Sequence, residues 1–477
     1  MHAARFILNY TFLTALLCLA AGQAQAAQGW VQSYKAGYTD ASGTYCGGSE
    51  IMHIVPHKGK LYAFNGYWKD ANFGKHSAQV LRLDSPNGQW QVDLETTKNA
   101  LKYEQGNLMH MKGNILKSVT FKTDKNGKQI DVTLLVAGSW AFNNNEKGHQ
   151  AVSFFQRDDA SGRWTHTLLQ DGPRDVPQEG QDKPVQIRRV PRDIEIYHDP
   201  ATKVDRIFML VGDPGILSGV YNSETGRIEW DTEPEHPKGG QAFPARPLGI
   251  AEANGTLYFS IGGQIFKRNN GPKPTWVEAY RIPGRVNTDV GGIRGLTAIP
   301  NPNGAGESLL FVWTPHGRAL GDIKRLDGKE LKDNTETTLR ALWNNEKIPE
   351  SGRPLYHLGG YNMLLPVKDP KSGKTVHLIG FQTKVADANE ALVWNRYYKG
   401  AMYAIRTADR KYSVQEVNGR YAAPKPVLLA PRTFAHSPFP EEKGTIYFGG
   451  HDANGFMSTD MAWIFKADAT TVLYGEK

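Results

Sequence analysis

The recurrence of a four-strand unit constrains the fold of this chain more than any other feature of the sequence. The unit is clearest in residues 51–95, where the apolar strand patterns 51–56 and 61–64 flank a glycine-containing turn. A long polar segment separates them from two further strand patterns, 79–83 and 89–93, which flank the turn sequence Asp-Ser-Pro-Asn-Gly. One such meander has two open edges and cannot bury both faces alone, so it needs neighbours of its own kind.

Copies of the unit are marked by an aromatic residue that follows a turn and opens a strand alternating between polar and apolar residues. Six copies carry tryptophan and a seventh carries tyrosine, namely Trp30, Trp90, Trp164, Trp230, Trp276, Trp343 and Tyr412. Such repetition in a chain of 477 residues, rich in glycine and aromatic residues, is typical of β-propellers. The sequence therefore predicts an all-β fold, a seven-bladed β-propeller. A pair of β-sandwiches, or a chance spacing of tryptophan, is the alternative.

The two ends of the chain predict how the ring closes. Trp30 opens a fourth strand with no three strands before it, whereas the last unit, which ends near Asp468, has three strands and no fourth. Pairing of residues 30–34 with residues 463–466 would close the ring through the N-terminal strand and remove the open edges.

The N-terminal segment has the features of an export signal. A basic residue, Arg5, precedes an apolar run at residues 12–20 and a small-residue cleavage pattern at residues 24–26. We therefore expect residues 1–26 to be removed and residues 27–477 to form a single propeller domain, in a periplasmic or secreted protein. The apolar run is too short to span a bilayer, and no other segment predicts a membrane span.

Charge, cysteine content and motifs argue against several classes of protein. The net charge is only +8, and no basic run or arginine-rich helix indicates nucleic-acid binding. Beyond the export signal, Cys46 is the one cysteine, so no internal disulfide is expected in what we predict to be a monomer. CxxC, HExxH and G-x-S-x-G motifs are absent from the sequence, so neither a catalytic zinc nor a covalent nucleophile is indicated.

Candidate binding residues gather where a propeller opens on one face, at the starts of innermost strands and in the loops between second and third strands. Arg192, Arg246 and Arg294 head three consecutive innermost strands. A guanidinium group matches carboxylate, sulfate or phosphate, and three of them at one mouth would attract an anionic substrate. Alternatively, each arginine caps a loop or pairs with a nearby aspartate, such as Asp193 or Asp289.

The tripeptide Asp-Ala-Asn recurs in the second-to-third-strand loops of three neighbouring predicted blades, beginning at Asp70, Asp387 and Asp452. Oxygen ligands of this kind suit sugar hydroxyls or a hard cation, so calcium is a candidate cofactor. An ordinary turn stabilised by the Asp side chain is the alternative for each copy.

Histidines and aromatic residues occur in the same loops. Aromatic rings offer sugars an apolar platform, and histidine or tyrosine can exchange protons near neutral pH. His53 is expected inside the innermost strand of the first blade, facing the channel, whereas His57 is expected at the opposite face. The candidate residues in the loops of this face are Tyr67, Trp68, His76, His316, Arg318, His436 and His451.

An exported propeller with these side chains on one face resembles the propeller-fold polysaccharide lyases, including the enzymes that act on ulvan and on rhamnosyl-glucuronate linkages. The resemblance rests on the architecture and on a first-blade pattern of a histidine on the first strand, a Gly-Tyr-Trp strand end and a second histidine beyond it. In this sequence the two histidines are His53 (or His57) and His76.

The resemblance implies β-elimination at a uronic acid of an acidic polysaccharide. A cation or an arginine neutralises the carboxylate, a histidine or tyrosine removes the C5 proton, and a tyrosine or histidine protonates the departing oxygen. Catalytic roles then fall to His76, His53, Tyr67 and Arg246. A glycoside hydrolase with paired carboxylates from the Asp-Ala-Asn loops, or a non-catalytic carbohydrate- or protein-binding propeller, is the alternative.

Overall fold

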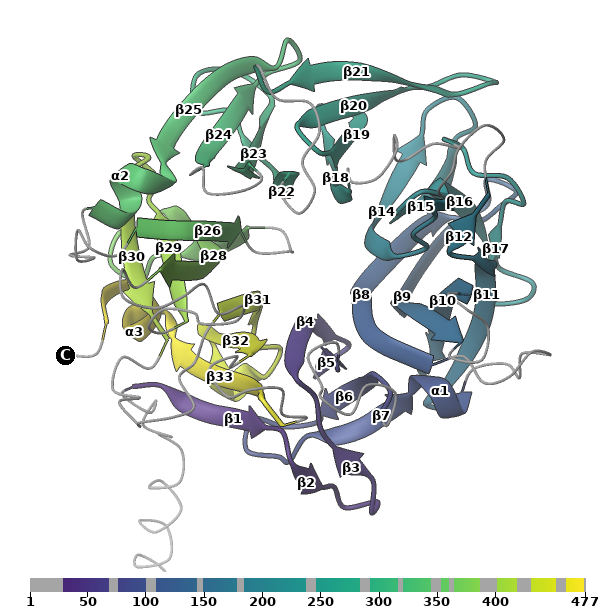
Figure 1. The fold of residues 1–477 in the computed structure, drawn as a ribbon, viewed down its shortest axis with the longest axis horizontal. Coiled ribbons are helices and arrows are strands. Elements are labelled where there is room, and N and C mark those ends of the chain that lie inside the picture. Colours follow the sequence, from purple (N-terminus) through teal and green to yellow (C-terminus); the bar gives the residue numbers. More distant parts are fainter. Residues whose placement is uncertain are drawn as a thin grey trace, which may run out of the picture.

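The structure is a computed structural model that describes the chain in thirteen segments. They are residues 29–67, 76–99, 109–143, 149–177, 184–236, 246–283, 292–315, 321–344, 353–359, 364–386, 401–417, 430–451 and 460–475. Within these segments the protein is all-β apart from short helices, and its antiparallel sheets stand side by side in a ring (Figure 1). The short helices are α1 (Thr96–Asn99), α2 (Leu339–Asn344), the 3-10 helix η1 (Pro440–Glu442) and α3 (Ala469–Tyr474).

Five sheets form separate blades. The first contains β14 (Pro191–Asp199), β15 (Val204–Val211), β16 (Gly215–Asn222) and β17 (Arg227–Trp230). The second contains β18 (Pro247–Ala253), β19 (Thr256–Ile261), β20 (Gln264–Asn269) and β21 (Thr275–Arg281). The third contains β22 (Gly292–Pro300), β23 (Glu307–Thr314), β24 (Asp322–Asp327) and β25 (Lys332–Thr338). The fourth contains β26 (Arg353–Gly359), β27 (Leu365–Lys368), β28 (Thr375–Ala386), β29 (Met402–Arg406) and β30 (Tyr412–Glu416). The fifth contains β31 (Ala430–His436), β32 (Thr445–His451), β33 (Ala462–Asp468) and β1 (Val31–Lys35).

An eight-stranded sheet holds two meanders that the sequence predicted as separate blades. The first contains β4 (Glu50–His57), β5 (Lys60–Gly66), β6 (Gln79–Leu83) and β7 (Gln91–Glu95). The second contains β8 (Met109–Thr123), β9 (Gln129–Asn143), β10 (His149–Asp158) and β11 (Arg163–Pro173). Two-stranded hairpins, β2 (Tyr38–Thr39) with β3 (Tyr45–Cys46) and β12 (Asp175–Val176) with β13 (Val185–Gln186), complete the strands.

Glycines explain why these two meanders merge into one sheet. Gly66 at the end of β5 pairs with Lys112 in β8. At Gly113 a Cβ atom would lie only 2.2 Å from the ring of Phe64, so a side chain there would hold the two strands apart. The described residues therefore form a propeller-like ring of five separate blades and one double sheet, where seven separate blades were predicted.

The predicted pairing of the N-terminal strand with the last sheet is confirmed. β1 runs antiparallel to β33, with Val31 opposite Lys466 and Lys35 opposite Trp463. The indole nitrogen of Trp90 in the next meander donates to Ser33 Oγ at 3.0 Å, which ties β1 to its neighbour. The N-terminal strand thus joins the first and last units.

The aromatic markers of the sequence bind the sheets to one another. Three of them, in addition to Trp90, donate a hydrogen bond to the meander that precedes theirs in the ring, whereas Trp230 Nε1 has no hydrogen-bond partner among the described residues. Trp164 Nε1 donates to Asp93 at 2.8 Å, Trp276 Nε1 to Glu235 at 3.0 Å, and Tyr412 Oη to Glu336 at 2.5 Å. Tyr412, the marker without tryptophan, therefore makes the same kind of contact as the tryptophans.

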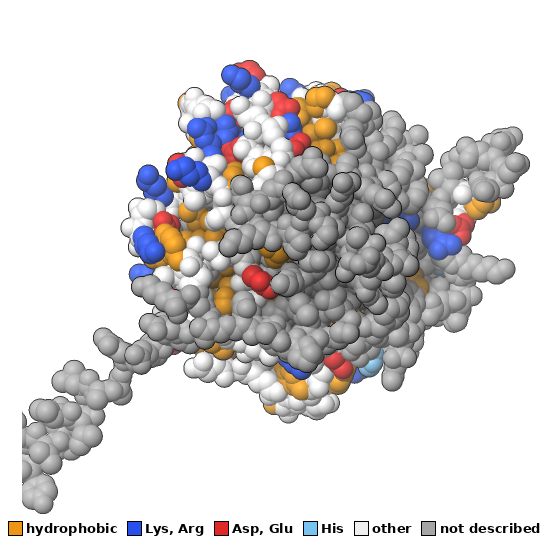
Figure 2. All heavy atoms as spheres, turned by 60° about the vertical axis from the view of Figure 1, so that its left-hand side comes forward, with side chains coloured by type: hydrophobic (Ala, Val, Ile, Leu, Met, Phe, Trp, Pro, Cys, Tyr) orange, Lys and Arg blue, Asp and Glu red, His pale blue; other side chains and the backbone are white. Residues whose placement is uncertain are grey.

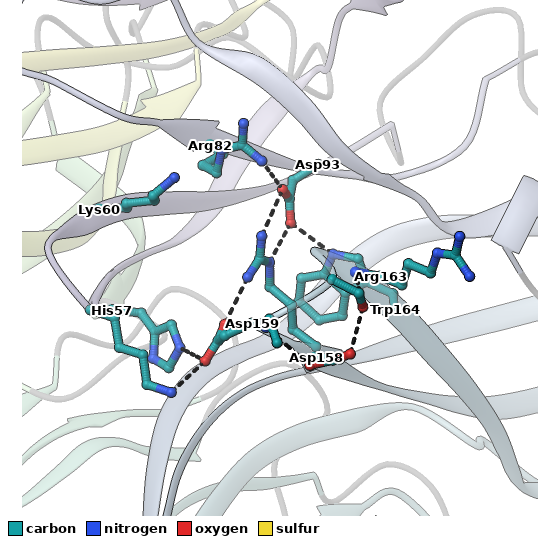
Figure 3. Close-up of polar contacts among 12 residues, drawn as sticks. His57, Lys60, Arg82, Asp93, Asp158, Asp159, Arg163 and Trp164 are labelled. Atoms are coloured by element: carbon teal, nitrogen blue, oxygen red, sulfur yellow. Dashed lines mark hydrogen bonds and ion pairs between the residues drawn. The ribbon is translucent and has the colours of Figure 1, made fainter.

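A buried arginine joins each of these carboxylates. Arg157 Nε lies 2.8 Å from Asp93, Arg268 Nε 2.7 Å from Glu235, and Arg406 Nε 2.6 Å from Glu336. Figure 3 shows the group around Asp93, whose carboxylate also forms an ion pair with Arg82. Each group unites a carboxylate at the outer edge of one meander with an arginine and an aromatic donor of the following meander.

The inner strands begin with a change of register. The shift lies between Ile51 and His53 in β4, between Pro191 and Asp193 in β14, and between Pro431 and Thr433 in β31. Bulges of this kind re-aim a side chain and are common beside functional sites. They alter the direction of the chain at the strand ends that carry the predicted site residues.

No helix among the described residues is long and apolar enough to cross a membrane. On the side shown in Figure 2, basic and acidic side chains lie close together on the described surface. This mixture agrees with the small net charge of the sequence.

Buried histidines predict how stability depends on pH. Burial lowers the pKa of His110 to about 3 and the pKa of His166 and His377 to about 4. An unfolded histidine titrates near pH ~6.5, so below that pH the unfolded chain binds protons that the folded chain does not, and stability falls as the pH falls. Burial raises the pKa of Asp193 to about 6, which offsets part of this loss.

We expect each of the three histidines to lower the free energy of unfolding by about 2 kcal/mol between pH 7 and pH 5. Urea unfolding at the two pH values measures the net change, to which His53 adds and from which Asp193 subtracts. A His110→Phe variant should show a shallower pH dependence than the parent. An equal pH dependence in both proteins would contradict the assignment of His110.

Candidate functional site

Three aromatic side chains form a stack where β5 ends. The imidazole of His76 stacks on the rings of both Tyr45 and Tyr67, with centroid distances of 5.5 and 5.4 Å and interplanar angles of 29° and 21°. His76 and Tyr45 are half-buried, and Tyr67 is buried. Tyr45 Oη donates a short hydrogen bond to the carboxylate of Asp460. The structure therefore brings the predicted pair Tyr67 and His76 into contact.

Amide side chains hold this stack against the sheet. Gln79 Nε2 donates to the Tyr45 carbonyl at 2.8 Å, and Asn65 Nδ2 donates to the Gly47 carbonyl at 2.8 Å. A Cβ atom at Gly47 would lie 2.5 Å from Tyr67 Oη, so the tyrosine needs a glycine there. Asn65 and Gln79 are both buried, and their hydrogen bonds restrain the position of the stack.

A buried ionic group lies at the same end of the inner strands. Glu50, the first residue of β4, has its Oε2 2.9 Å from Arg432 Nε and its Oε1 3.5 Å from Lys112 Nζ. Arg432 Nε also lies 3.2 Å from His451 Nδ1, which accepts from it. Arg432 occupies the bulge of β31, so the bulge aims its guanidinium group at the neighbouring inner strand. We call Glu50, Lys112, Arg432 and His451 the ionic cluster.

His53 lies further along β4. Its Nε2 is 2.7 Å from the carbonyl oxygen of Asn114 in β8, so that nitrogen carries the proton and donates it. Burial lowers the pKa of His53 to about 4, against the effect of that hydrogen bond, and nearby Lys112 lowers it further. His53 is therefore neutral at pH 7, with Nδ1 as its unprotonated nitrogen.

The three predicted arginines begin neighbouring inner strands. Arg192 lies at the bulge of β14, Arg246 directly precedes β18, and Arg294 is the third residue of β22. β18 packs against both β14 and β22. Arg192 and Arg246 are half-buried and Arg294 is buried. Within the described part of the chain, the buried Nε of Arg246 has no hydrogen-bond partner.

The structure separates two predicted neighbours. His451 ends β32 and belongs to the ionic cluster. His436 instead ends β31, the inner strand that Arg432 begins, and its Nε2 contacts the Pro366 carbonyl at 2.7 Å. Because a full strand length separates it from Arg432, His436 lies at the opposite end of the sheet. This placement corrects the expectation that His436 shares the site.

The remaining predicted residues lie outside the described segments, namely Trp68, Asp70, His316, Arg318, Asp387 and Asp452. Within the described segments, no group of three or more His, Cys, Asp or Glu residues is arranged to hold a metal ion. The expectation of calcium stays a prediction.

Sequence reasoning missed Tyr45, Glu50, Arg432 and Asp460. One sequence pattern pointed to Arg432. A Pro-Arg dipeptide lies near the start of β31, after Ala430, and the same dipeptide at the start of β14 contains the predicted Arg192. Glu50 and Asp460 carry no local pattern, and their importance follows only from contacts across the ring closure.

A second histidine group lies at the other end of β4, as predicted for His57. Ser118 Oγ is 2.8 Å from His57 Nδ1, and His57 Nε2 is 2.9 Å from Asp159 Oδ2. These are the residue types of a catalytic triad. However, Lys58 and Arg157 each approach Asp159 to 2.7 Å and already neutralise its carboxylate. The group therefore ties β4 to β8 and to the turn after β10.

Comparison with known proteins supports the fold. No protein-family model matches the chain, and no curated protein matches it in sequence. Among solved structures, an ancestral GH74 enzyme matches with a TM-score of 0.50 at 9% identity, covering 94% of this chain and 52% of that one. The chain thus spans about half the length of this neighbour. At such identity the likeness shows the fold alone.

Looser matches include the WD40 domain of SCAP from fission yeast, with a TM-score of 0.34 at 9% identity over 89% of this chain and 85% of that one, and two enzymes. Trypanosoma rangeli sialidase in complex with sialic acid matches with a TM-score of 0.35 at 11% identity, over 76% of this chain and 57% of that one. An alpha-L-arabinofuranosidase from Clostridium thermocellum matches with a TM-score of 0.27 at 12% identity, over 60% and 92%.

Proposed function

We propose that the chain is an exported, carbohydrate-acting propeller that cleaves an acidic polysaccharide by β-elimination. In this proposal it is a seven-bladed ring, since the double sheet contributes two meanders of four strands each. The observation that carries the proposal is the stacking of His76 on Tyr45 and Tyr67, at the same end of the inner strands as the ionic cluster. The GH74 neighbour adds a carbohydrate-active precedent on the same fold.

The stack offers the two proton-transfer groups that the reaction needs. His76 is half-buried and can accept the C5 proton, while a tyrosine hydroxyl can protonate the departing oxygen. Ring stacking restrains the orientation of the imidazole, which reduces the entropy lost on reaching the transition state. No covalent intermediate is required, in agreement with the absence of a nucleophile motif.

Cationic side chains supply the second requirement, neutralisation of the uronate carboxylate. Arg246 directly precedes the middle one of the three neighbouring inner strands and is half-buried, whereas Arg294 is buried. Arg432 is already paired with Glu50, so its charge is largely neutralised within the protein. We therefore assign carboxylate binding to Arg246, with Arg192 and Arg294 on the adjoining strands.

An absorbance assay tests the reaction type. Incubation with uronic-acid polysaccharides should produce the ultraviolet absorbance of unsaturated products. New reducing ends without that absorbance would indicate a hydrolase and overturn the lyase proposal. Binding without either signal would indicate a non-catalytic carbohydrate-binding propeller.

Replacing Arg246 by alanine should weaken binding of an acidic oligosaccharide by about 1.5–3 kcal/mol, the range for hydrogen bonds to charged groups. Titration calorimetry measures the change. Arg410→Ala is the matched control, because Arg410 is an exposed arginine in the turn after β29, outside the proposed site. Equal affinities of the Arg246 variant and the parent protein would remove Arg246 from the site.

A further inference from the structure

A hollow of about 720 Å³ lies at the end of the sheets away from the aromatic stack. Its walls come from the start of β9, the end of β10, the turn after β16 and Lys58 in the turn after β4. The stack and Lys58 lie at opposite ends of β4 and β5, so roughly 20 Å of strand separates the two places. We call this feature the β9 hollow.

Unequal strand lengths create the β9 hollow. β8 and β9 have 15 residues each, whereas β10 has 10 and β11 has 11, so the β8–β9 hairpin extends past its neighbours. Its tip rests on the next sheet, where Lys125 N donates to the Tyr221 carbonyl at 2.7 Å. Phe121 stacks on Tyr221 with a centroid distance of 5.5 Å. The overhang is therefore fixed, and the space beside it is built into the fold.

Most charges around the β9 hollow are already paired. Lys58 and Arg157 bind Asp159, and Asp131 binds Lys122 at 2.6 Å. The carboxylate of Asp158 accepts from the turn that follows it, at Ala160 N and Ser161 Oγ. The charged lining groups therefore largely neutralise one another, so a highly charged ligand such as a phosphate is not favoured.

Hydroxyl groups supply the remaining polar lining. Thr133, Thr165 and Thr225 line the β9 hollow together with the exposed guanidinium group of Arg227. Thr133 Oγ1 shares a hydrogen bond of 2.8 Å with Thr120 Oγ1, which leaves capacity for another partner. Leu134 adds apolar surface. Hydroxyls that both donate and accept, beside apolar patches, match the edges and faces of a sugar ring.

We propose that the β9 hollow binds a short oligosaccharide through its ring hydroxyls, as a second carbohydrate site on the face away from the aromatic stack. Its volume falls within the range of about 300–1,000 Å³ typical of small-molecule pockets. The site is independent of catalysis. It would hold a polysaccharide against the protein whether or not the other face cleaves it.

Titration calorimetry with the full chain tests the site, with a neutral tetrasaccharide and a uronate tetrasaccharide as separate probes. The double variant Thr165→Val/Thr225→Val keeps the side-chain shapes and removes two hydroxyl groups. We expect it to bind the neutral probe about tenfold more weakly than the parent, from the loss of two hydrogen bonds. The uronate probe should lose the same factor when the double variant is made in an Arg246→Ala background, which removes binding at the proposed catalytic site. Turnover of polysaccharide by the double variant itself under saturating substrate should not change, which separates this site from the proposed catalytic one.

Arg163→Ala is the matched control, because Arg163 lies on β11, the strand that also carries Thr165. Arg163 is exposed, does not line the β9 hollow, and points away from the group around Asp93 in Figure 3. Its variant should bind both probes as the parent does. The proposal is overturned if the double variant binds as tightly as the parent or if neither probe binds. It is also overturned if the uronate alone binds and only Arg227→Ala abolishes that binding.

Discussion

Replacing His76 by alanine is expected to reduce turnover of an acidic polysaccharide by about 10²–10⁴-fold, the usual contribution of a general acid or base. Binding should change far less, because a proton acceptor acts in the transition state rather than in the bound ground state. The substitution would also remove the ring on which both Tyr45 and Tyr67 stack, which is a second reason to expect lower turnover. Steady-state kinetics followed by product absorbance measures both quantities.

Two further variants make this test specific. Tyr67→Phe keeps the ring that stacks on His76 and removes only the hydroxyl group, so it separates proton transfer from packing. His436→Ala is the matched histidine control, because His436 lies at the opposite end of its sheet. Turnover of His76→Ala equal to that of the parent would remove His76 from the mechanism and leave the fold unaffected.

The sequence predicted those parts of the fold that depend on local chemistry. Turn residues and alternating strands located the four strands of residues 51–95. An unmatched fourth strand at Trp30 predicted the pairing of β1 with β33. Both inferences succeed because turn geometry and open strand edges constrain the chain over short distances.

Contacts between sheets were not predictable in the same way. The joining of β5 to β8 depends on the close approach that Gly66 and Gly113 allow, which no turn or period reveals. The aromatic markers were recognised as strand markers, yet the partners of their polar tips lie in another sheet. Glu50 and Arg432 meet only because the ring closes.

The position of His436 shows a related limit. A residue at the start of a strand and one at its end differ by only a few positions in the sequence, but they lie on opposite faces of the ring. His451 lies at the end of β32, which runs antiparallel to β31. It therefore lies on the same face of the ring as Arg432, which is near the start of β31. Assigning a residue to a face therefore requires strand boundaries accurate to one or two residues.

Replacing Asp93 by alanine is expected to lower the free energy of unfolding by about 3 kcal/mol, the lower end of the range for breaking a buried ion pair, because Arg157 keeps its second partner, Asp159. The Asp93 side chain is 2% exposed. Its carboxylate forms ion pairs with Arg82 at 2.5 Å and Arg157 at 2.8 Å, and it accepts a hydrogen bond from Trp164 Nε1 at 2.8 Å. Arg157 is itself only 6% exposed, so water cannot replace the missing carboxylate. Urea unfolding followed by tryptophan fluorescence measures the change.

The double variant Asp93→Leu/Arg157→Met distinguishes an unpaired charge from lost packing. Apolar side chains of similar size can replace a buried ion pair at little cost, so this protein should recover much of the stability lost in Asp93→Ala. Glu278→Ala is the surface control, because its pair with Arg281 is exposed and worth about 1 kcal/mol or less. If Asp93→Ala unfolds at the same urea concentration as the parent, the carboxylate does not hold the two meanders of the double sheet together. Equal losses in the single and double variants would assign the effect to packing, because a buried Arg157 that has lost one of its two carboxylate partners would make the single variant the less stable of the two.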